Sequence, residues 1–230
     1  MAVIGTGAAG HRAAIQAAKL GAKVVAVERR STIGGAVVNG SIPSKTLRES
    51  ILFLSGARHR AFGLPADAPR KPVALGDLLQ HLGAVLSRET GVMQDQLTRN
   101  GVEIAFGPAR FVGDHRIQVA DRDEVIWAEK VILAPGTVPA RSEKVPVNGE
   151  TIVDADQVLR IREIPRSLLI VGAGVIGTEY AGIFTTLGVR VTVVDQRTEF
   201  LEFLDRDIVR ALVGHMERAV ASFRLGVSLK

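Results

Sequence analysis

Two glycine-rich segments of this chain have residue types and spacing suited to binding phosphate groups. They are G-x-G-x-x-G motifs, at Gly5, Gly7 and Gly10 and at Gly172, Gly174 and Gly177. In such a motif the first glycine makes a tight turn after a strand, and the second lets a pyrophosphate approach the backbone. The third lets the next helix pack on that strand, and the N–H groups at the helix N-terminus face the phosphates. The motifs therefore predict dinucleotide binding at two places.

An acidic residue follows each motif at the same distance. Glu28 and Asp195 each stand 18 residues after the third glycine, at the end of a Val-rich run. A carboxylate at this point accepts hydrogen bonds from a ribose hydroxyl. Residues 5–30 and 172–197 align without a gap and are identical at nine of 26 positions. One motif alone would be weak evidence, but two in register, each with its acid, favour binding over the alternative that both sets are packing glycines.

The surrounding pattern supplies the elements that position these residues. Each copy reads as strand, glycine turn, helix and strand, with Gly21 or Gly188 placed to end the helix. The other predicted elements are a helix at 45–60, a loop at 64–72, an amphipathic helix at 73–100, four short strands forming a β-meander within 101–134, a connector at 151–164, a helix at 205–220 and a strand at 223–230.

These elements predict an α/β fold with two Rossmann-like dinucleotide-binding units. Residues 1–150 would form the first unit, with a helical insertion and the β-meander. Residues 151–230 would form the second, truncated after βαβαβ, since a doubly wound domain contains two such halves. The second half of such a domain is therefore expected to be missing from the second unit.

Composition excludes several other classes of protein. The chain has no cysteine, which rules out disulfides, thiolate metal sites and cysteine nucleophiles within it. A net charge of +5, short basic runs and 4% aromatic residues argue against a nucleic-acid surface, and the charge suits either a solvated surface or attraction of anionic ligands. We expect no membrane span, no secretory signal and a cytoplasmic protein. The spacing of the five histidines suggests no metal site, and we expect them at the surface or as capping groups.

Three stretches resemble the flavoprotein pyridine nucleotide–disulfide oxidoreductase superfamily, and within it the soluble FAD-containing NAD(P) transhydrogenases. They are GTGAAG with VVAVER, GGAVVNGSIPSKTLRES, and IVGAGVIGTEYAGIF with RVTVVDQR and LEFLDRDIV. The resemblance covers nearly the whole chain but about half of the family's length. It implies that the first repeat, with Gly35, holds the ADP part of FAD, and that the second holds NAD(H) or NADP(H). The implied reaction moves hydride from NADPH to NAD⁺ through the flavin, in a full-length homodimer whose interface region is missing here.

The resemblance also assigns roles to single residues. Val37 and Ser41 match the places of two redox cysteines, in a stretch one residue shorter than the family pattern, so disulfide reduction is not expected. Lys45 would lie near the flavin N5 atom, paired with Glu179. From the residues alone, a solvated lysine at the start of a helix is the favoured interpretation of Lys45, and Glu179 can be an acid stabilised by a helix N-terminus.

Two further features are expected at the edges of the binding sites. Gly136 lies in a turn similar to the family's turn beside FAD, although Pro135 there removes a backbone donor. Asp195 suits a ribose 2′-hydroxyl, whereas Arg197 could attract a 2′-phosphate, which would fit an enzyme that accepts both nucleotides. Alternatively, Arg197 is a surface residue.

Two other functions stay open at this point. The chain could belong to a flavoprotein reductase with an acceptor such as a quinone, or it could be an inactive dinucleotide-binding fragment. An unpaired sheet edge in such a fragment would lower its solubility.

Overall fold

The computed structural model describes residues 1–230 except 36, 55–73, 121–124, 141–144, 219–220 and 229–230. The chain divides into two compact units. Unit 1 comprises residues 1–43 and 83–138, and unit 2 comprises residues 44–82 and 139–230. Each unit holds one of the glycine motifs and is described by itself. The predicted loop at 64–72 and the end of the predicted helix at 45–60 lie outside the described residues.

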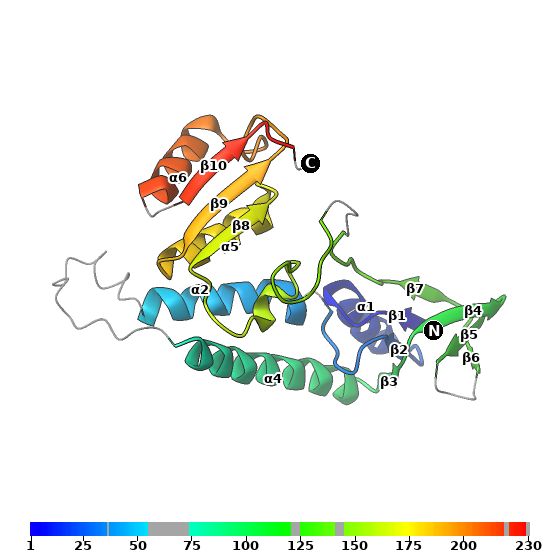
Figure 1. The fold of residues 1–230 in the computed structure, drawn as a ribbon. Helices are drawn as coiled ribbons and strands as arrows, with labels where there is room; N and C mark the ends of the chain where they lie inside the picture. Colours follow the sequence, from blue (N-terminus) through cyan, green and yellow to red (C-terminus); the bar gives the residue numbers. More distant parts are fainter. Residues whose placement is uncertain (36, 55–73, 121–124, 141–144, 219–220, 229–230) are drawn as a thin grey trace. The chain divides into compact units, whose positions relative to one another are not determined.

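Unit 1 is built on a four-stranded parallel sheet (Figure 1). Its order is β3-β2-β1-β7, with β1 at Ala2–Ile4, β2 at Val25–Glu28, β3 at Glu103–Phe106 and β7 at Val131–Leu133. Strand β1 pairs with β2 on one side and with β7 on the other, so the chain enters the glycine turn from the middle of the sheet.

Alternating side chains of β1 pack against two different layers, helices on one face of the sheet and a β-meander on the other. Val3 packs with apolar residues of helix α1 (Ala8–Lys19) and with Leu97 of helix α4 (Leu75–Arg99). Ala2 packs on the other face with Ile117 of a three-stranded antiparallel meander. The meander strands are β4 at Ala109–Gly113, β5 at Arg116–Val119 and β6 at Val125–Trp127. Period-two alternation in β1 therefore buries both faces of the sheet.

The predicted four-stranded meander has three strands in the structure, and parts of the predicted segment pair elsewhere. β3 and β7 join the parallel sheet, and only β4, β5 and β6 form the meander. The prediction rested on alternation, which identifies a strand but not its partner. Because β3 follows the long helix α4, it is placed as the return strand of a crossover, which pairs in parallel.

The segment after the first acid also differs from the prediction. Val37–Ser41 form a π-helical turn, and helix α2 follows at once as Ile42–Leu54. The predicted helix began at Lys45, after Pro43, but proline is compatible with the first turn of a helix. Lys45 therefore does not open the helix.

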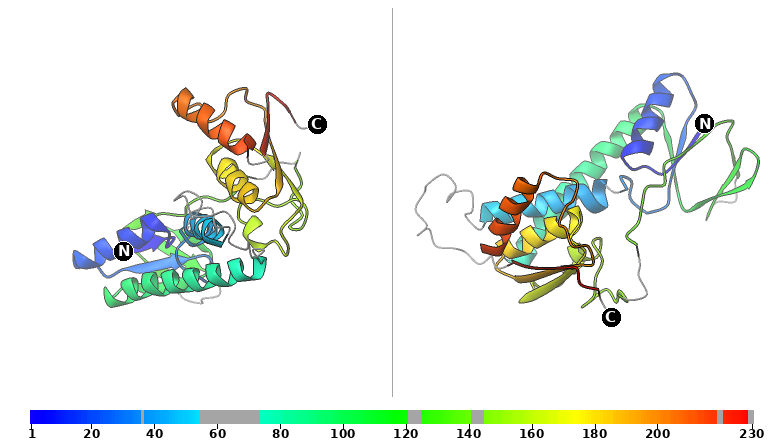
Figure 2. Two further views of the ribbon diagram at one scale, coloured as in Figure 1. Left: turned by 90° about the vertical axis from the view of Figure 1, so that its left-hand side faces the viewer. Right: turned by 90° about the horizontal axis from the view of Figure 1, so that it is seen from above.

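Unit 2 contains a three-stranded parallel sheet in the order β10-β9-β8. Its elements are β8 at Ser167–Val171, helix α5 at Val175–Thr186, β9 at Arg190–Asp195, helix α6 at Arg206–Arg218, β10 at Ala221–Leu225 and a 3-10 turn, η2, at Val158–Arg160. Both helices lie on the same side of the sheet (Figure 2). This arrangement confirms the predicted βαβαβ order.

Residues that precede the second repeat in sequence complete its core. Leu47 and Ile51 of α2 and Leu78 of α4 belong to one buried cluster with Tyr180 and Phe184 of α5. This packing explains why residues 44–82 group with unit 2 and do not follow the expected division near residue 150. The assignment of 1–150 and 151–230 to two cofactors stays a prediction.

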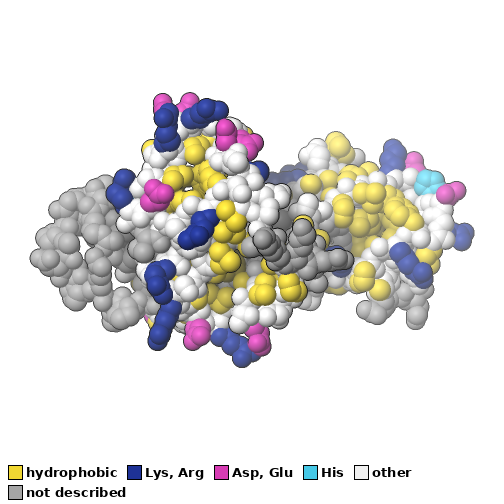
Figure 3. Space-filling view, turned by 45° about the horizontal axis from the view of Figure 1, so that its top comes forward, with side chains coloured by type: hydrophobic (Ala, Val, Ile, Leu, Met, Phe, Trp, Pro, Cys, Tyr) yellow, Lys and Arg dark blue, Asp and Glu magenta, His cyan; other side chains and the backbone are white. Residues whose placement is uncertain are grey.

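Apolar side chains are also exposed, and one face of the molecule shows several groups of them (Figure 3). Phe111 and Trp127 of the meander are 56% and 67% exposed. Leu169 and Val171, which point away from α5 on strand β8, are 56% and 50% exposed. The sheet of unit 2 is therefore covered by helices on one side, while its edge strand keeps apolar side chains exposed on the other.

Candidate dinucleotide-binding sites

The three glycines of each motif are under different physical constraints. In the second motif Gly172 has φ +109, a conformation that L-residues rarely adopt. A Cβ on Gly177 would stand 2.0 Å from the carbonyl oxygen of Gly172, so only glycine lets α5 come this close. Gly174 is under neither constraint, because its φ is −79 and a Cβ there would meet nothing within 4 Å.

The first motif repeats this division of roles. Gly5 has φ +100, and a Cβ on Gly10 would stand 1.9 Å from the Gly5 carbonyl oxygen. Gly7 has φ −66, and its added Cβ would meet Gly35 Cα at 3.8 Å and the Gly34 carbonyl oxygen at 3.9 Å, which are ordinary contact distances. No neighbouring atom therefore requires a glycine at the middle positions, Gly7 and Gly174. Each directly precedes a helix N-terminus, and neither helix has a side-chain cap or an acid in its first turn. This is the geometry that a pyrophosphate needs.

Glu28 is buried at the end of β2 and is held by the glycine turn. Its Oε2 accepts the backbone N–H of Thr6 at 3.2 Å and the Thr6 hydroxyl at 2.5 Å. Its Oε1 accepts the backbone N–H of Arg30 at 3.0 Å. The same Thr6 hydroxyl accepts the N–H of Gly34 at 3.2 Å, which ties the next loop to the site.

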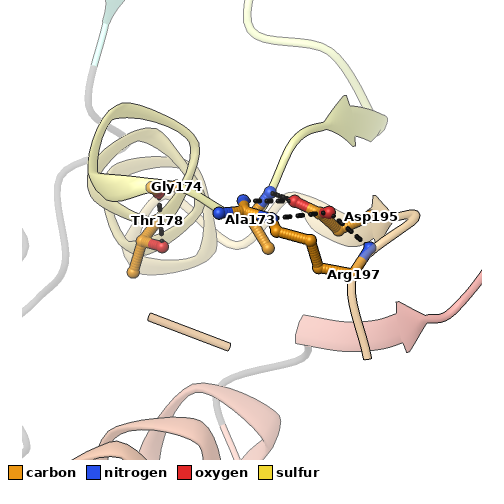
Figure 4. Close-up of polar contacts among 5 residues, drawn as sticks. All are labelled: Ala173, Gly174, Thr178, Asp195 and Arg197. Atoms are coloured by element: carbon orange, nitrogen blue, oxygen red, sulfur yellow. Dashed lines mark hydrogen bonds and ion pairs between the residues drawn. The ribbon is translucent and has the colours of Figure 1, made fainter. Parts of the chain in front are cut away.

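Asp195 takes the equivalent place at the end of β9, and its contacts are drawn in Figure 4. Its Oδ2 accepts the backbone N–H of Ala173 at 2.7 Å, and its Oδ1 accepts the backbone N–H of Arg197 at 2.8 Å. The guanidinium of Arg197 adds two more hydrogen bonds, from Nε to Oδ1 at 3.0 Å and from Nη2 to Oδ2 at 2.6 Å. Hydrogen bonds from Arg197 are the main reason why the pKa of Asp195 lies well below its usual range.

The sequence repeat is therefore also a repeat of hydrogen bonds. In both copies the acid joins the residue after the first glycine to the residue two positions beyond the acid itself. Both helices also end alike: Ala22 N–H bonds to Ala17 O, and Val189 N–H bonds to Phe184 O, around Gly21 and Gly188 at positive φ. These are Schellman motifs, so the predicted glycine helix ends are confirmed.

Lys45 and Glu179 meet, as the resemblance implied. The Lys45 Nζ lies 3.2 Å from the Glu179 Oε1, and both residues belong to unit 2. The side chain of Lys45 is 68% exposed and that of Glu179 is 23% exposed. An exposed pair of this kind contributes only about 0–1 kcal/mol to stability, so the structure does not need it for folding. Its role near a flavin stays a prediction.

The remaining predicted site residues lie around the first glycine turn. Gly35 has φ +51 and packs beside Gly7. Gly136 has φ +70 and follows Ala134, whose carbonyl oxygen lies where a Cβ on Gly5 would stand. Gly35 and Gly136 therefore come from loops on either side of the motif, and their contact with a cofactor stays a prediction.

Sequence reasoning missed two residues of unit 1. Thr6 is fully buried and connects Glu28 to Gly34, although its place inside the glycine motif marks it as a turn residue only. His11 was expected at the surface or as a capping group and is instead 5% exposed, with its Nε2 3.2 Å from the carbonyl oxygen of Met93. Burial lowers the pKa of His11. Its position directly after Gly10, on the face of α1 that packs inward, was the available signal.

Two searches of the described residues bear on other functions. No group of three His, Asp or Glu side chains in this part of the chain is arranged to hold a metal ion. None of the helices within it has both the length and the apolar character needed to cross a membrane.

Comparison with known proteins identifies the family. The pyridine nucleotide-disulphide oxidoreductase family matches residues 1–230. The chain belongs to this family. The soluble pyridine nucleotide transhydrogenase of Mycobacterium bovis (strain BCG / Pasteur 1173P2) is 41% identical over 229 residues, covering 97% of this chain and 49% of the relative. The Pseudomonas syringae pv. syringae (strain B728a) protein of the same name is 38% identical over 221 residues, covering 93% of this chain and 47% of the relative.

Solved structures show the same fold. LpdA from Mycobacterium tuberculosis superposes with a TM-score of 0.87 at 26% identity, over 98% of this chain and 51% of that chain. The HOCl-induced flavoprotein disulfide reductase RclA from Escherichia coli gives a TM-score of 0.82 at 25% identity, over 99% of this chain and 49% of that chain. These matches confirm an α/β fold with Rossmann-like parallel sheets and the resemblance to the transhydrogenases. The chain spans about half the length of the proteins it matches.

Proposed function

We propose that this chain forms the dinucleotide-binding part of a soluble, FAD-dependent NAD(P) transhydrogenase. Unit 1 would hold FAD through Gly5, Gly7, Gly10 and Glu28, with Gly35 and Gly136 beside them. The motif of unit 2 would hold NAD(H) or NADP(H) in turn, each exchanging hydride with the flavin. FAD, when bound, supplies the group that accepts a hydride from one nicotinamide and returns it to the other.

The observation that carries this proposal is the pair of middle glycines, Gly7 and Gly174. Neither is required by its own φ angle or by a neighbour that a Cβ would strike. Each stands before an uncapped helix N-terminus, in a unit where a buried acid is already held by the turn. A ligand that brings a pyrophosphate to the turn and a ribose to the acid accounts for all three features.

The absence of cysteine favours one of two chemistries found in this family. Disulfide reduction needs a pair of thiols in the chain, and the positions matched to them are Val37 and Ser41. Hydride exchange between nicotinamides needs no thiol. The chain is therefore a better candidate for transhydrogenation, the activity named for the relatives that are 41% and 38% identical, than for disulfide reduction.

In this proposal Lys45 and Glu179 act on the reacting centre through position and charge. Lys45 carries a positive charge that would stabilise electron density on a neighbouring ring, and Glu179 holds the ammonium group in place from α5. Because the pair is exposed and contributes little to folding, substitution should change reaction rates more than stability.

The test uses the purified 230-residue chain mixed with FAD. We expect FAD fluorescence to be quenched on binding, and NADPH then to bleach the flavin absorbance. Gly7→Val should abolish FAD binding and keep NADP⁺ binding, whereas Gly174→Val should do the reverse, because each valine adds its bulk before the helix N-terminus of its own unit only. A chain that retains no FAD under any condition, or variants that lose both ligands together, would contradict the assignment of the two units.

A further inference from the structure

We propose that Arg197 sets the nucleotide preference of the second repeat, favouring NADP(H) over NAD(H) although an aspartate ends β9. This inference rests on the proposed function, since it names the substrate class of the same site. An acid at this place ordinarily selects a 2′-hydroxyl and repels a 2′-phosphate. The hydrogen bonds around Asp195 reverse that expectation.

The acceptor capacity of Asp195 is already used. A carboxylate has about four lone-pair sites for hydrogen bonds. Four donors occupy them here: the backbone N–H of Ala173, the backbone N–H of Arg197, and Nε and Nη2 of the same arginine. The side chain of Asp195 is only 6% exposed. A ribose hydroxyl can therefore reach this carboxylate only if the guanidinium of Arg197 moves away.

Arg197 itself is open to a ligand. Its side chain is 48% exposed, in contrast to the aspartate beneath it. A guanidinium carries five N–H bonds, and the contacts with Asp195 use one on Nε and one on Nη2. The other three form no hydrogen bond with the part of the chain that the structure describes, and a planar fork of this kind matches the oxygens of a phosphate. Arg197 can thus bind a 2′-phosphate without leaving Asp195.

Charge supports the same choice. The pair of Asp195 and Arg197 is neutral overall, so an incoming 2′-phosphate does not meet an uncompensated carboxylate. The pKa of Asp195 is lowered by these contacts, which keeps the carboxylate ionised and the pair intact. Glu202 is the one other charged group acting on Arg197 within the described residues, and it raises the pKa of the guanidinium together with Asp195.

The first repeat shows what the arginine adds. There the third donor to the carboxylate is the hydroxyl of Thr6, whose short side chain is buried and held by the turn. The equivalent of Thr6 in the second repeat is Ala173, which has no hydroxyl, and the guanidinium of Arg197 supplies the missing donors. A long exposed side chain has replaced a buried one at the point where a ribose would lie.

The experiment is isothermal titration of the full chain with NADP⁺ and NAD⁺, for the wild type and three variants. The wild type should bind NADP⁺ more tightly than NAD⁺. In Arg197→Ala, NADP⁺ affinity should fall roughly 10- to 100-fold while NAD⁺ affinity stays equal or rises, because the carboxylate becomes available to the 2′-hydroxyl. Arg197→Lys keeps the charge but not the fork and should be intermediate. Arg190→Ala, at the opposite end of β9, removes the same charge and should change neither affinity.

The outcomes separate the inference from the proposed function. If Arg197→Ala leaves NADP⁺ affinity unchanged, or weakens both nucleotides equally, the inference is wrong while dinucleotide binding stands. If the wild type binds neither nucleotide, the proposed function fails and the inference with it. Binding of 2′-AMP and of 5′-AMP, each measured as a competitor, provides a second measurement. Only the affinity for 2′-AMP should fall in Arg197→Ala. If that variant does not fold, as seen by circular dichroism, an unchanged NADP⁺ affinity in Arg197→Lys overturns the inference instead.

Discussion

Gly177→Ala should lower the stability of the fold, whereas Gly174→Ala should leave stability nearly unchanged and weaken nucleotide binding. A Cβ on Gly177 would stand 2.0 Å from the carbonyl oxygen of Gly172 and 3.2 Å from Cγ2 of Ile170. Real Cβ contacts are essentially never below 3.0 Å, so helix α5 would have to shift by at least about 1 Å. The obstacle is backbone and cannot rotate away.

The cost follows from what α5 buries. The helix places Tyr180, Ala181, Ile183 and Phe184 in the core of unit 2, so a shift of the helix disturbs the whole cluster. Overpacking that forces backbone movement destabilises by about 1–3 kcal/mol, and we expect Gly177→Ala near the upper end of this range. Gly174→Ala meets nothing within 4 Å. Its gain of about 0.4–1 kcal/mol from a stiffer unfolded chain is offset by the poorer N-cap, leaving a change within about 0.5 kcal/mol.

For nucleotide binding, Gly174→Ala is the variant expected to show the loss. The added methyl group of Gly174→Ala occupies the space in front of the α5 N-terminus, so NADP⁺ affinity should fall by about tenfold or more. Urea unfolding followed by circular dichroism measures the first effect, and titration calorimetry measures the second. A Gly177→Ala variant as stable as the wild type would refute the packing argument, and a Gly174→Ala variant with full affinity would refute the assignment of the open space to a pyrophosphate.

Three further predictions concern single side chains. Thr6→Val removes the hydroxyl between Glu28 and the next loop and should lower the free energy of unfolding by about 1–3 kcal/mol, whereas Thr6→Ser should not, as urea unfolding would show. Burial, with the nearby carboxylate of Glu179, raises the pKa of Tyr180 to about 12. The folded state therefore holds the phenol proton more tightly, so stability complete below pH about 10 should be lost as the pH rises towards 12, by at most about 2 kcal/mol. Tyr180→Phe should remove this part of the pH dependence when both proteins are unfolded between pH 9 and 12. Glu179→Gln and Lys45→Met should change the melting temperature little but slow flavin reduction by NADPH in stopped flow, and unchanged rates would show that the pair is only a surface contact.

The features predictable from the sequence are those fixed by neighbouring residues. Gly21 and Gly188 end their helices through contacts within five residues, and the strand–turn–helix order follows from the same short range. The wrong predictions concern partners far away in the chain. Strands β3 and β7 look like meander strands locally, and only the crossover through α4 and the pairing with β1 place them in the parallel sheet.

The same distinction between local and long-range signals applies to the residues of the candidate sites. The glycines and the two acids could be identified because their spacing is itself the signal. The burial of His11 and the bridging role of Thr6 were missed, because the contacts that show them are with residues 82 and 22–28 positions away. The contact between Lys45 and Glu179 spans 134 positions and was expected only because the family resemblance implied it.

The repeated hydrogen bonds explain how one ancestral arrangement can serve two ligands. In both copies backbone N–H groups hold the acid on either side, so the carboxylate closes the turn before any ligand arrives. Because this structural role fixes the acid, a copy can change its ligand preference only through the remaining donor to the carboxylate. That donor is Thr6 in one copy and Arg197 in the other, and nucleotide preference should therefore respond to Arg197 far more than to the acid's identity as Asp or Glu.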